Sequence, residues 1–152
     1  MKYQATFVPS LPFTPFHSLS LLLLLIPLLV ASCTPDRCRT PFGDGGTLDI
    51  TMPDFADLAS VGGSVTINRG HKGIFVRRTS YTSFVAFECA CPAGCDVRLL
   101  PDGDWGGAVL ECPTCHSRFE TEYGNPLEGS ATGCPLYEYS THFDGYLLTI
   151  YP

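Results

Sequence analysis

Polar and apolar residues alternate in short segments along the chain from about residue 47 onward. In residues 47–52, TLDITM, the apolar side chains of Leu48, Ile50 and Met52 are separated by polar residues. Alternation with a period of two is typical of half-buried β-strands. Further short apolar or alternating segments, separated by turn residues, lie at 65–67, 74–78, 84–88, 97–99, 108–111, 136–140 and 146–151. Strands at this spacing predict an all-β fold, an antiparallel sandwich or barrel.

Three segments between these strands depart from the alternation. Residues 54–59, DFADLA, predict either one helical turn or a loop with its apolar side chains tucked in. Residues 101–107, PDGDWGG, have the composition of a hairpin tip, so the predicted β-hairpin brings Cys112 back beside Cys91. Residues 122–133 contain several glycines and predict a loop.

Two short cysteine clusters flank this hairpin. The first supplies Cys89 and Cys91, and the second supplies Cys112 and Cys115. Each cluster can offer two thiolates from one tight turn, and four converging thiolates suit Zn²⁺ or an iron–sulfur centre. They do not suit Mg²⁺ or Ca²⁺, which take oxygen ligands. We therefore expect a metal centre, with oxidation of the same cysteines to disulfides as the alternative.

The start of the chain has the features of an export signal. An apolar run at residues 19–30 follows a segment in which Lys2 is the only positive charge, and the run is short for a membrane-spanning helix. The run ends in VAS followed by Cys33, which resembles the lipobox of bacterial lipoproteins. In that motif the cysteine becomes the lipidated first residue of the mature protein. An ordinary export signal that happens to end near a cysteine is the alternative.

This resemblance divides the chain into three parts. Residues 1–32 are expected to be a lipoprotein signal peptide, residues 33–46 a linker rich in Pro, Gly and Asp, and residues 47–152 the folded domain. The expected location is the bacterial cell envelope, where acyl chains would anchor an extracytoplasmic domain to a membrane.

The charge of the chain limits its partners. A formal net charge of -6 and a pI near 5.0 give no basic surplus for binding the nucleic-acid backbone, so nucleic acid is not expected as a partner. The sequence has no evident nucleophile–base pair or carboxylate dyad, so catalysis on a substrate is not expected either. These features favour an electron-transfer or binding protein over an enzyme.

Three segments together resemble the Rieske iron–sulfur domain family. They are AFECACPAGCDV at residues 86–97, CPTCHSRFE at residues 112–120, and the pair GSA and PLYEY at residues 129–131 and 135–139. The family has C-x-H and C-P-x-H-G-S loops followed by G-P-A and L-x-x-Y segments. The resemblance covers nearly all of residues 47–151 and implies a [2Fe–2S] cluster held by two loops of an antiparallel sandwich or barrel.

The departures from the Rieske pattern concern the two histidine ligands. The resemblance places Cys91 and Cys115 where the family has histidine, as in exported Rieske-like lipoproteins with cysteine at these positions. The implied ligands are then Cys89, Cys91, Cys112 and Cys115. In a competing register His116 takes the second histidine's role.

Four thiolate ligands change the expected redox chemistry. They imply a potential near the low, ferredoxin-like end of the range, because neutral imidazoles are what raise the potential of Rieske centres. Ser117 matches the family serine whose hydroxyl bonds a bridging sulfide. Phe119 stands where high-potential members have a tyrosine, so it cannot add a second hydrogen bond.

The remaining cysteines leave an open pairing. Eight cysteines, less Cys33 and the four proposed ligands, leave Cys38, Cys95 and Cys134. Cys95 is thus free to bond Cys134 or Cys38, or to replace Cys89 as a ligand. Because segments flanking a Rieske-like site lie close together, we expect a disulfide between Cys95 and Cys134.

Two function classes follow from these features. The first is a membrane-tethered carrier that passes one electron at a time from a [2Fe–2S] cluster to a redox partner in the cell envelope. The alternative is a lipoprotein in which Zn²⁺ bound by four cysteines, or disulfides, only hold the domain together. The sequence does not identify the redox partner.

Substituting Cys33 tests the lipid anchor. Cys33→Ser removes the thiol that would carry the acyl chain, so we expect the protein to leave the membrane fraction or to remain unprocessed. Fractionation of expressing cells, followed by immunoblotting, measures the distribution. An unchanged membrane fraction would contradict the lipoprotein hypothesis.

Overall fold

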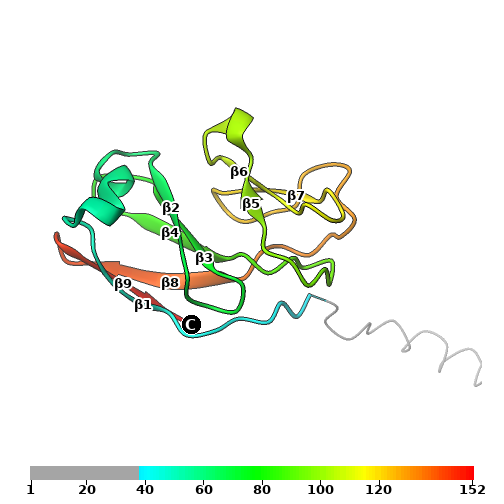
Figure 1. The fold of residues 1–152 in the computed structure, drawn as a ribbon, viewed down its shortest axis with the longest axis horizontal. Coiled ribbons are helices and arrows are strands. Elements are labelled where there is room, and N and C mark those ends of the chain that lie inside the picture. Colours follow the sequence, from blue (N-terminus) through cyan, green and yellow to red (C-terminus); the bar gives the residue numbers. More distant parts are fainter. Residues whose placement is uncertain (1–37) are drawn as a thin grey trace, which may run out of the picture. The chain divides into compact units, whose positions relative to one another are not determined.

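The computed structural model describes residues 38–152, and this part of the chain is built almost entirely from β-strands (Figure 1). The all-β prediction is confirmed. The strands are β1 Gly46–Asp49, β2 Ser64–Ile67, β3 Ile74–Arg78, β4 Phe84–Glu88, β5 Leu100–Pro101, β6 Val109–Glu111, β7 Arg118–Glu120, β8 Glu138–Phe143 and β9 Leu147–Tyr151. Two 3-10 helices, η1 Pro53–Ala59 and η2 Gly103–Trp105, complete the described elements.

The strands form two antiparallel sheets. The larger sheet has six strands in the order β1-β9-β8-β4-β3-β2, and the smaller has three in the order β5-β6-β7. Every recorded strand pair is antiparallel. Figure 1 shows the smaller sheet and its loops beside the ends of β3 and β4. The insertion that carries both cysteine clusters therefore forms its own small layer.

Strands β3 and β4 are buried on both faces. On β3, Ile74 and Val76 belong to one apolar cluster and Phe75 to another. On β4, Ala86 belongs to the first cluster and Phe87 to the second. Successive side chains of a strand point to opposite faces. A strand that is covered on both faces therefore needs an apolar residue at nearly every position. This requirement explains why IFV and FVAF show little alternation in the sequence.

The first core lies within the curved six-stranded sheet and is closed by η1. Leu58 of η1 is fully buried, and η1 contacts β2 and β3. The helical-turn alternative for residues 54–59 is therefore the one observed. The buried members of this core are Leu48, Ile50, Leu58, Ile67, Ile74, Val76, Phe84, Ala86, Tyr139, Leu148 and Ile150.

The second core lies beneath the cysteine loops. It joins Phe75 and Phe87 of the large sheet to Leu110 and Phe119 of the small sheet. Its other buried members are Cys89, Cys91, Leu99, Cys112 and Leu136. The cysteine clusters are thus part of the apolar contact between the two sheets, and burial of this core positions both loops.

Residues 38–45 have no regular secondary structure, yet they pack on the domain. Cys38 forms a disulfide with Cys134, 96 residues away in the sequence. Phe42 stacks on Tyr137 with ring centroids 4.2 Å apart. The backbone N–H of Gly43 donates to the Tyr139 hydroxyl over 3.1 Å.

The observed disulfide corrects one prediction. Cys134 pairs with Cys38 and not with Cys95, whose thiol is free. The physical reason is that residues 38–45 run along β8, as the contacts of Phe42 and Gly43 with Tyr137 and Tyr139 show. Cys38 therefore arrives beside the start of β8, whereas the Cys95 side chain joins the other loop cysteines.

The small sheet also differs from the predicted hairpin. Residues 97–99 do not pair with β6, because the Leu99 N–H donates to the Cys89 carbonyl over 2.8 Å and closes the first cysteine loop. The strand facing β6 is instead Leu100–Pro101. Strand β7 was not predicted, because it has a single apolar residue, Phe119, between two charged ones. Its partner β6 pairs Leu110 with Phe119 in the second core.

Two further predictions fall on residues that the structure does not describe. The signal peptide and Cys33 lie outside residues 38–152. Within the described part, no helix is long and apolar enough to cross a membrane.

The disulfide offers a direct stability test. Because Cys38–Cys134 closes a loop of 96 residues, replacing both cysteines with serine should lower the free energy of unfolding by about 2–5 kcal/mol. Urea denaturation followed by circular dichroism measures the change. Each single variant should lose as much as the double variant, because either one removes the whole bond. Unfolding midpoints equal to that of the parent protein would contradict the observed pairing.

Candidate metal centre

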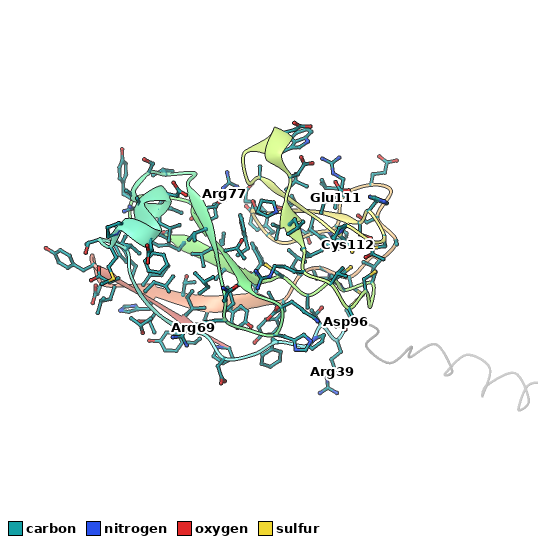
Figure 2. All side chains as sticks on the ribbon, viewed as in Figure 1. Arg39, Arg69, Arg77, Asp96, Glu111 and Cys112 are labelled. Atoms are coloured by element: carbon teal, nitrogen blue, oxygen red, sulfur yellow. A yellow bond between two sulfur atoms is a disulfide. The ribbon has the colours of Figure 1, made fainter. Side chains whose placement is uncertain are left out.

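Four cysteine sulfurs converge at the junction of two loops. The Sγ atoms of Cys91, Cys95, Cys112 and Cys115 all lie within 4.8 Å of one another. Two of them, on Cys91 and Cys115, are 3.7 Å apart. Figure 2 places Cys112 among the strands of the small sheet, with Glu111 beside it. We call these residues the four-cysteine group.

The first loop, residues 89–98, leaves β4 and returns beside its own start. The Cys89 N–H donates to the Gly73 carbonyl over 2.8 Å, and Ala90 forms an isolated bridge with Arg98. Inside the loop the Gly94 N–H donates to the Cys91 carbonyl over 3.0 Å. Gly94 has φ +85°, a conformation that glycine adopts without strain. This turn directs Cys95 back toward Cys91.

The second loop, residues 112–117, is a tight connection between β6 and β7. The Cys112 N–H donates to the Ser117 carbonyl and the His116 N–H donates to the Cys112 carbonyl, both over 2.9 Å. His116 has φ +56°, unusual for a residue other than glycine. The closed loop presents Cys112 and Cys115 from the same side.

The four-cysteine group differs by one residue from the set implied by the sequence resemblance. Cys89 is fully buried in the second core and does not join the group, and Cys95 supplies the fourth sulfur. Cys89 continues the side-chain alternation of β4, so it points to the same face as Phe87. The sulfur that joins those of Cys91, Cys112 and Cys115 is therefore that of Cys95, the residue named as the alternative to Cys89.

His116 does not take part in the group. Its side chain is largely exposed, and its Nδ1 lies 3.0 Å from Oε1 of Glu111. Within residues 38–152 the group contains sulfur donors only. The register that assigns His116 as a ligand therefore does not match this geometry.

Ser117 and Phe119 lie close to the four-cysteine group, and both are fully buried. The Ser117 hydroxyl is 3.2 Å from the Cys115 sulfur, and its oxygen also accepts the Ala131 N–H over 2.9 Å. Phe119 packs in the second core, where it has no hydroxyl to offer. Ser117 thus contacts the Cys115 sulfur directly, whereas the hydrogen bond to a bridging sulfide that the resemblance implies for it stays a prediction.

The thiols differ in their tendency to ionise. Burial, together with the neighbouring Glu88 carboxylate, raises the pKa of Cys89 to about 12. Burial also raises the pKa of Cys91. At Cys115 burial opposes ionisation, but hydrogen bonds from Ser117, together with those from Cys112 and Cys95, outweigh it and lower the pKa to about 6. Metals bind the thiolate form, which Cys115 offers at neutral pH. Burial disfavours the thiolate at Cys91, which belongs to the group, as well as at Cys89, which does not.

A buried carboxylate supports the first loop through a neighbouring turn. Glu88 is fully buried and accepts the N–H groups of His71 over 2.7 Å and Lys72 over 2.8 Å. The Tyr139 hydroxyl donates to it over 2.8 Å. These bonds fix the turn at residues 70–73, which we call the bracing turn.

The bracing turn holds the first loop at three points. The Gly73 carbonyl accepts the Cys89 N–H, the Lys72 carbonyl accepts from Nε of Arg98, and the Lys72 ammonium pairs with Asp96 over 2.5 Å. Asp96 is exposed, so the ion pair itself contributes little stability. The two hydrogen bonds to backbone carbonyls, from the Cys89 N–H and from Nε of Arg98, hold the two ends of the loop.

The donor set fits a thiolate-bound metal. Around one tetrahedral ion with metal–sulfur bonds of about 2.3 Å, sulfurs are about 3.8 Å apart. The observed 3.7 Å and the limit of 4.8 Å are compatible with that spacing. A [2Fe–2S] cluster accepts the same four thiolates as two pairs, one on each iron, and needs the pairs further apart. Both groups fit the chemistry of the donors, and the spacing is nearer to that of a single ion.

Comparisons with known proteins give limited likenesses. No protein-family model matches the chain, and no curated protein matches it. Among solved structures it is similar to the ferredoxin of carbazole 1,9a-dioxygenase from Nocardioides aromaticivorans IC177, with 18% identity and a TM-score of 0.43 over 74% of this chain and 99% of that chain. It is also similar to the complex of reduced oxygenase and oxidized ferredoxin in carbazole 1,9a-dioxygenase, with 19% identity and a TM-score of 0.38 over 74% of this chain and 94% of that chain. Likenesses of this size assign neither a cofactor nor an activity.

Replacing Glu88 tests the brace. Glu88→Gln keeps the shape but sets an amide against backbone N–H donors, so we expect a loss of about 1–3 kcal/mol in unfolding free energy. Tyr139→Phe removes one hydrogen bond to this carboxylate and the bond that the hydroxyl accepts from the Gly43 N–H. It leaves the carboxylate with its two backbone donors, so it should cost less, about 0.5–1.5 kcal/mol. Urea denaturation of the two variants measures both losses. A Glu88→Gln variant as stable as the parent would show that the buried carboxylate does not hold the bracing turn.

Proposed function

We propose that the four-cysteine group holds a [2Fe–2S] cluster and that the protein is a one-electron carrier tethered in the cell envelope. The observation that carries this proposal is the position of the group. Cys91 and Cys112 are buried, whereas Cys95 and Cys115 are half-buried, so two sulfur ligands reach the surface. A partner that docks there would come close to the cluster without entering the domain.

The bound cluster would supply reversible one-electron chemistry, and the protein would tune it. Four thiolates place a high negative charge on such a cluster, which favours its oxidised form and a low potential. The Ser117 hydroxyl, 3.2 Å from the Cys115 sulfur, can donate a hydrogen bond that stabilises the reduced state. Phe119 adds no hydrogen bond of its own.

The disulfide supports the proposed location. Disulfides persist in oxidising compartments such as the periplasm and cell surface, and are rare in the cytosol. Cys38 and Cys134 form a disulfide, and the four sulfurs of the group form none, which leaves them free to bind a metal. Together with the lipobox-like VAS–Cys33 segment, this favours an exported lipoprotein whose acyl chains contact the membrane and whose redox partner is another envelope protein.

A structural zinc site is the second candidate, because of the compactness of the group. All four sulfurs lie within 4.8 Å, close to the spacing around a single tetrahedral ion. A four-thiolate zinc site is closed and has no open coordination position or redox change, so the protein would then be a binding or structural lipoprotein.

Metal analysis decides between the two candidates. Protein purified without oxygen should be coloured, should contain iron and sulfide in equal amounts, and after reduction should give an EPR signal with the higher average g-value of an all-thiolate cluster. A lower, Rieske-type average would mean that an imidazole ligates. Colourless protein with one zinc per chain would replace electron transfer with the structural role.

Two cysteine variants identify the ligand set within the same experiment. Cys95→Ser should lose bound metal, because it removes one of the converging sulfurs. Cys89→Ser is the matched control, since it changes a buried cysteine of the same loop that lies outside the group. It should keep its metal, although burial of a hydroxyl costs some stability. Metal loss in Cys89→Ser with retention in Cys95→Ser would restore the ligand set implied by the sequence.

A further inference from the structure

A cavity of about 480 Å³ lies between the large sheet and the small one, apart from the four-cysteine group. Its volume is in the range of small-molecule sites. Arg77 of β3 lines one side, and residues of β6, β7 and η2 line the other. Trp105, Ala108, Val109 and Leu127 supply its apolar wall.

Arg77 brings an unneutralised positive charge to this cavity. Its guanidinium donates to the Thr121 hydroxyl over 3.1 Å, and its buried Nε has no hydrogen-bond partner. Within residues 38–152 no carboxylate lies within ion-pairing distance of it. Thr121 is fully buried and donates in turn to the Gly107 carbonyl over 2.9 Å. The guanidinium is therefore held in place but keeps most of its donors.

The second arginine of the cavity has a different role. Arg118 pairs with Asp102 over 2.9 Å, and its guanidinium carbon lies 5.6 Å from the centre of the Trp105 ring. Its charge is thus compensated, and it supports the indole from one side. Trp105 remains 57% exposed and offers an aromatic surface at the cavity.

The acidic residues around the cavity do not cancel the charge of Arg77. Both oxygens of Glu120 accept backbone N–H groups, from Asn125 over 2.9 Å on one oxygen and from Glu122 over 2.6 Å on the other. These bonds lower the pKa of Glu120 although burial opposes its ionisation, and they turn the carboxylate toward its own loop. Glu122 is exposed.

We propose that this cavity binds a small organic acid, a molecule with one carboxylate and a flat or short apolar body. Arg77 would pair with the carboxylate, and Trp105 with the apolar wall would cover the body. A single fixed guanidinium in an apolar cavity fits a singly charged planar anion better than a multiply charged one, whose further charges would lack partners. This inference is independent of the metal and of the proposed electron transfer.

Titration calorimetry on the metal-loaded protein tests the proposal, with benzoate and hexanoate as probes. We expect saturable binding of at least one acid and about tenfold weaker binding of benzamide, which lacks the charge. The chain has a single tryptophan, so its one indole N–H resonance should shift during the benzoate titration and report the site.

Three variants locate the binding. Arg77→Gln should weaken binding about tenfold, and Trp105→Ala, at an exposed position, about threefold or more. Arg69→Gln is the matched control because it removes an exposed arginine that Figure 2 shows well away from Arg77, and its affinity should be unchanged.

The proposal is overturned by any of three results. The first is that neither acid shows saturable binding up to about 20 mM, which is above the millimolar affinity expected for so few atoms. The second is that Arg69→Gln weakens binding as much as Arg77→Gln does. The third is that inorganic phosphate binds and neither acid does.

Discussion

The burial of β3 and β4 on both faces is the constraint on which the rest of the structure depends. One face closes the first core with η1, and the other supports the second core and, through it, both cysteine loops. A strand buried twice tolerates no polar side chain on either face unless that side chain is fully bonded. Glu88, at the end of β4, is such an exception. Its carboxylate accepts hydrogen bonds from three donors, so β4 can end in this buried acidic residue and continue directly into the first loop.

The same constraint explains how much of the site the sequence could predict. The strand segments, the two cysteine loops and three of the four converging sulfurs follow from apolar patterning and cysteine spacing. The fourth does not, because the choice between Cys89 and Cys95 depends on which residue still belongs to β4. Cys89 keeps the alternation of the strand and faces the core, whereas Cys95 returns through the Gly94 turn. A C-x-C spacing alone does not reveal where a strand ends.

Pairings between segments far apart in the sequence were the other part of the structure that the sequence pattern could not predict. The Cys38–Cys134 bond depends on residues 38–45 lying along β8, and the contacts that place them there involve Phe42 and Gly43, which carry no strand pattern. Strand β7 has one apolar residue, so its pairing with β6 comes from Phe119 reaching the second core. In both cases tertiary contacts decide a structure that local propensity leaves open.

Strand β7 also connects the four-cysteine group with the cavity between the sheets. Ser117, just before the strand, contacts the Cys115 sulfur, and the next residue, Arg118, lines the cavity. Both residues are held by one loop, since Ser117 accepts the Ala131 N–H and the Ser130 hydroxyl bonds the backbone of Arg118. Consecutive residues of an extended chain point to opposite faces. The Ser117 side chain therefore contacts a sulfur of the group, and the Arg118 side chain lines the cavity. A displacement of this backbone would therefore change the hydrogen bond to Cys115 and the cavity wall together.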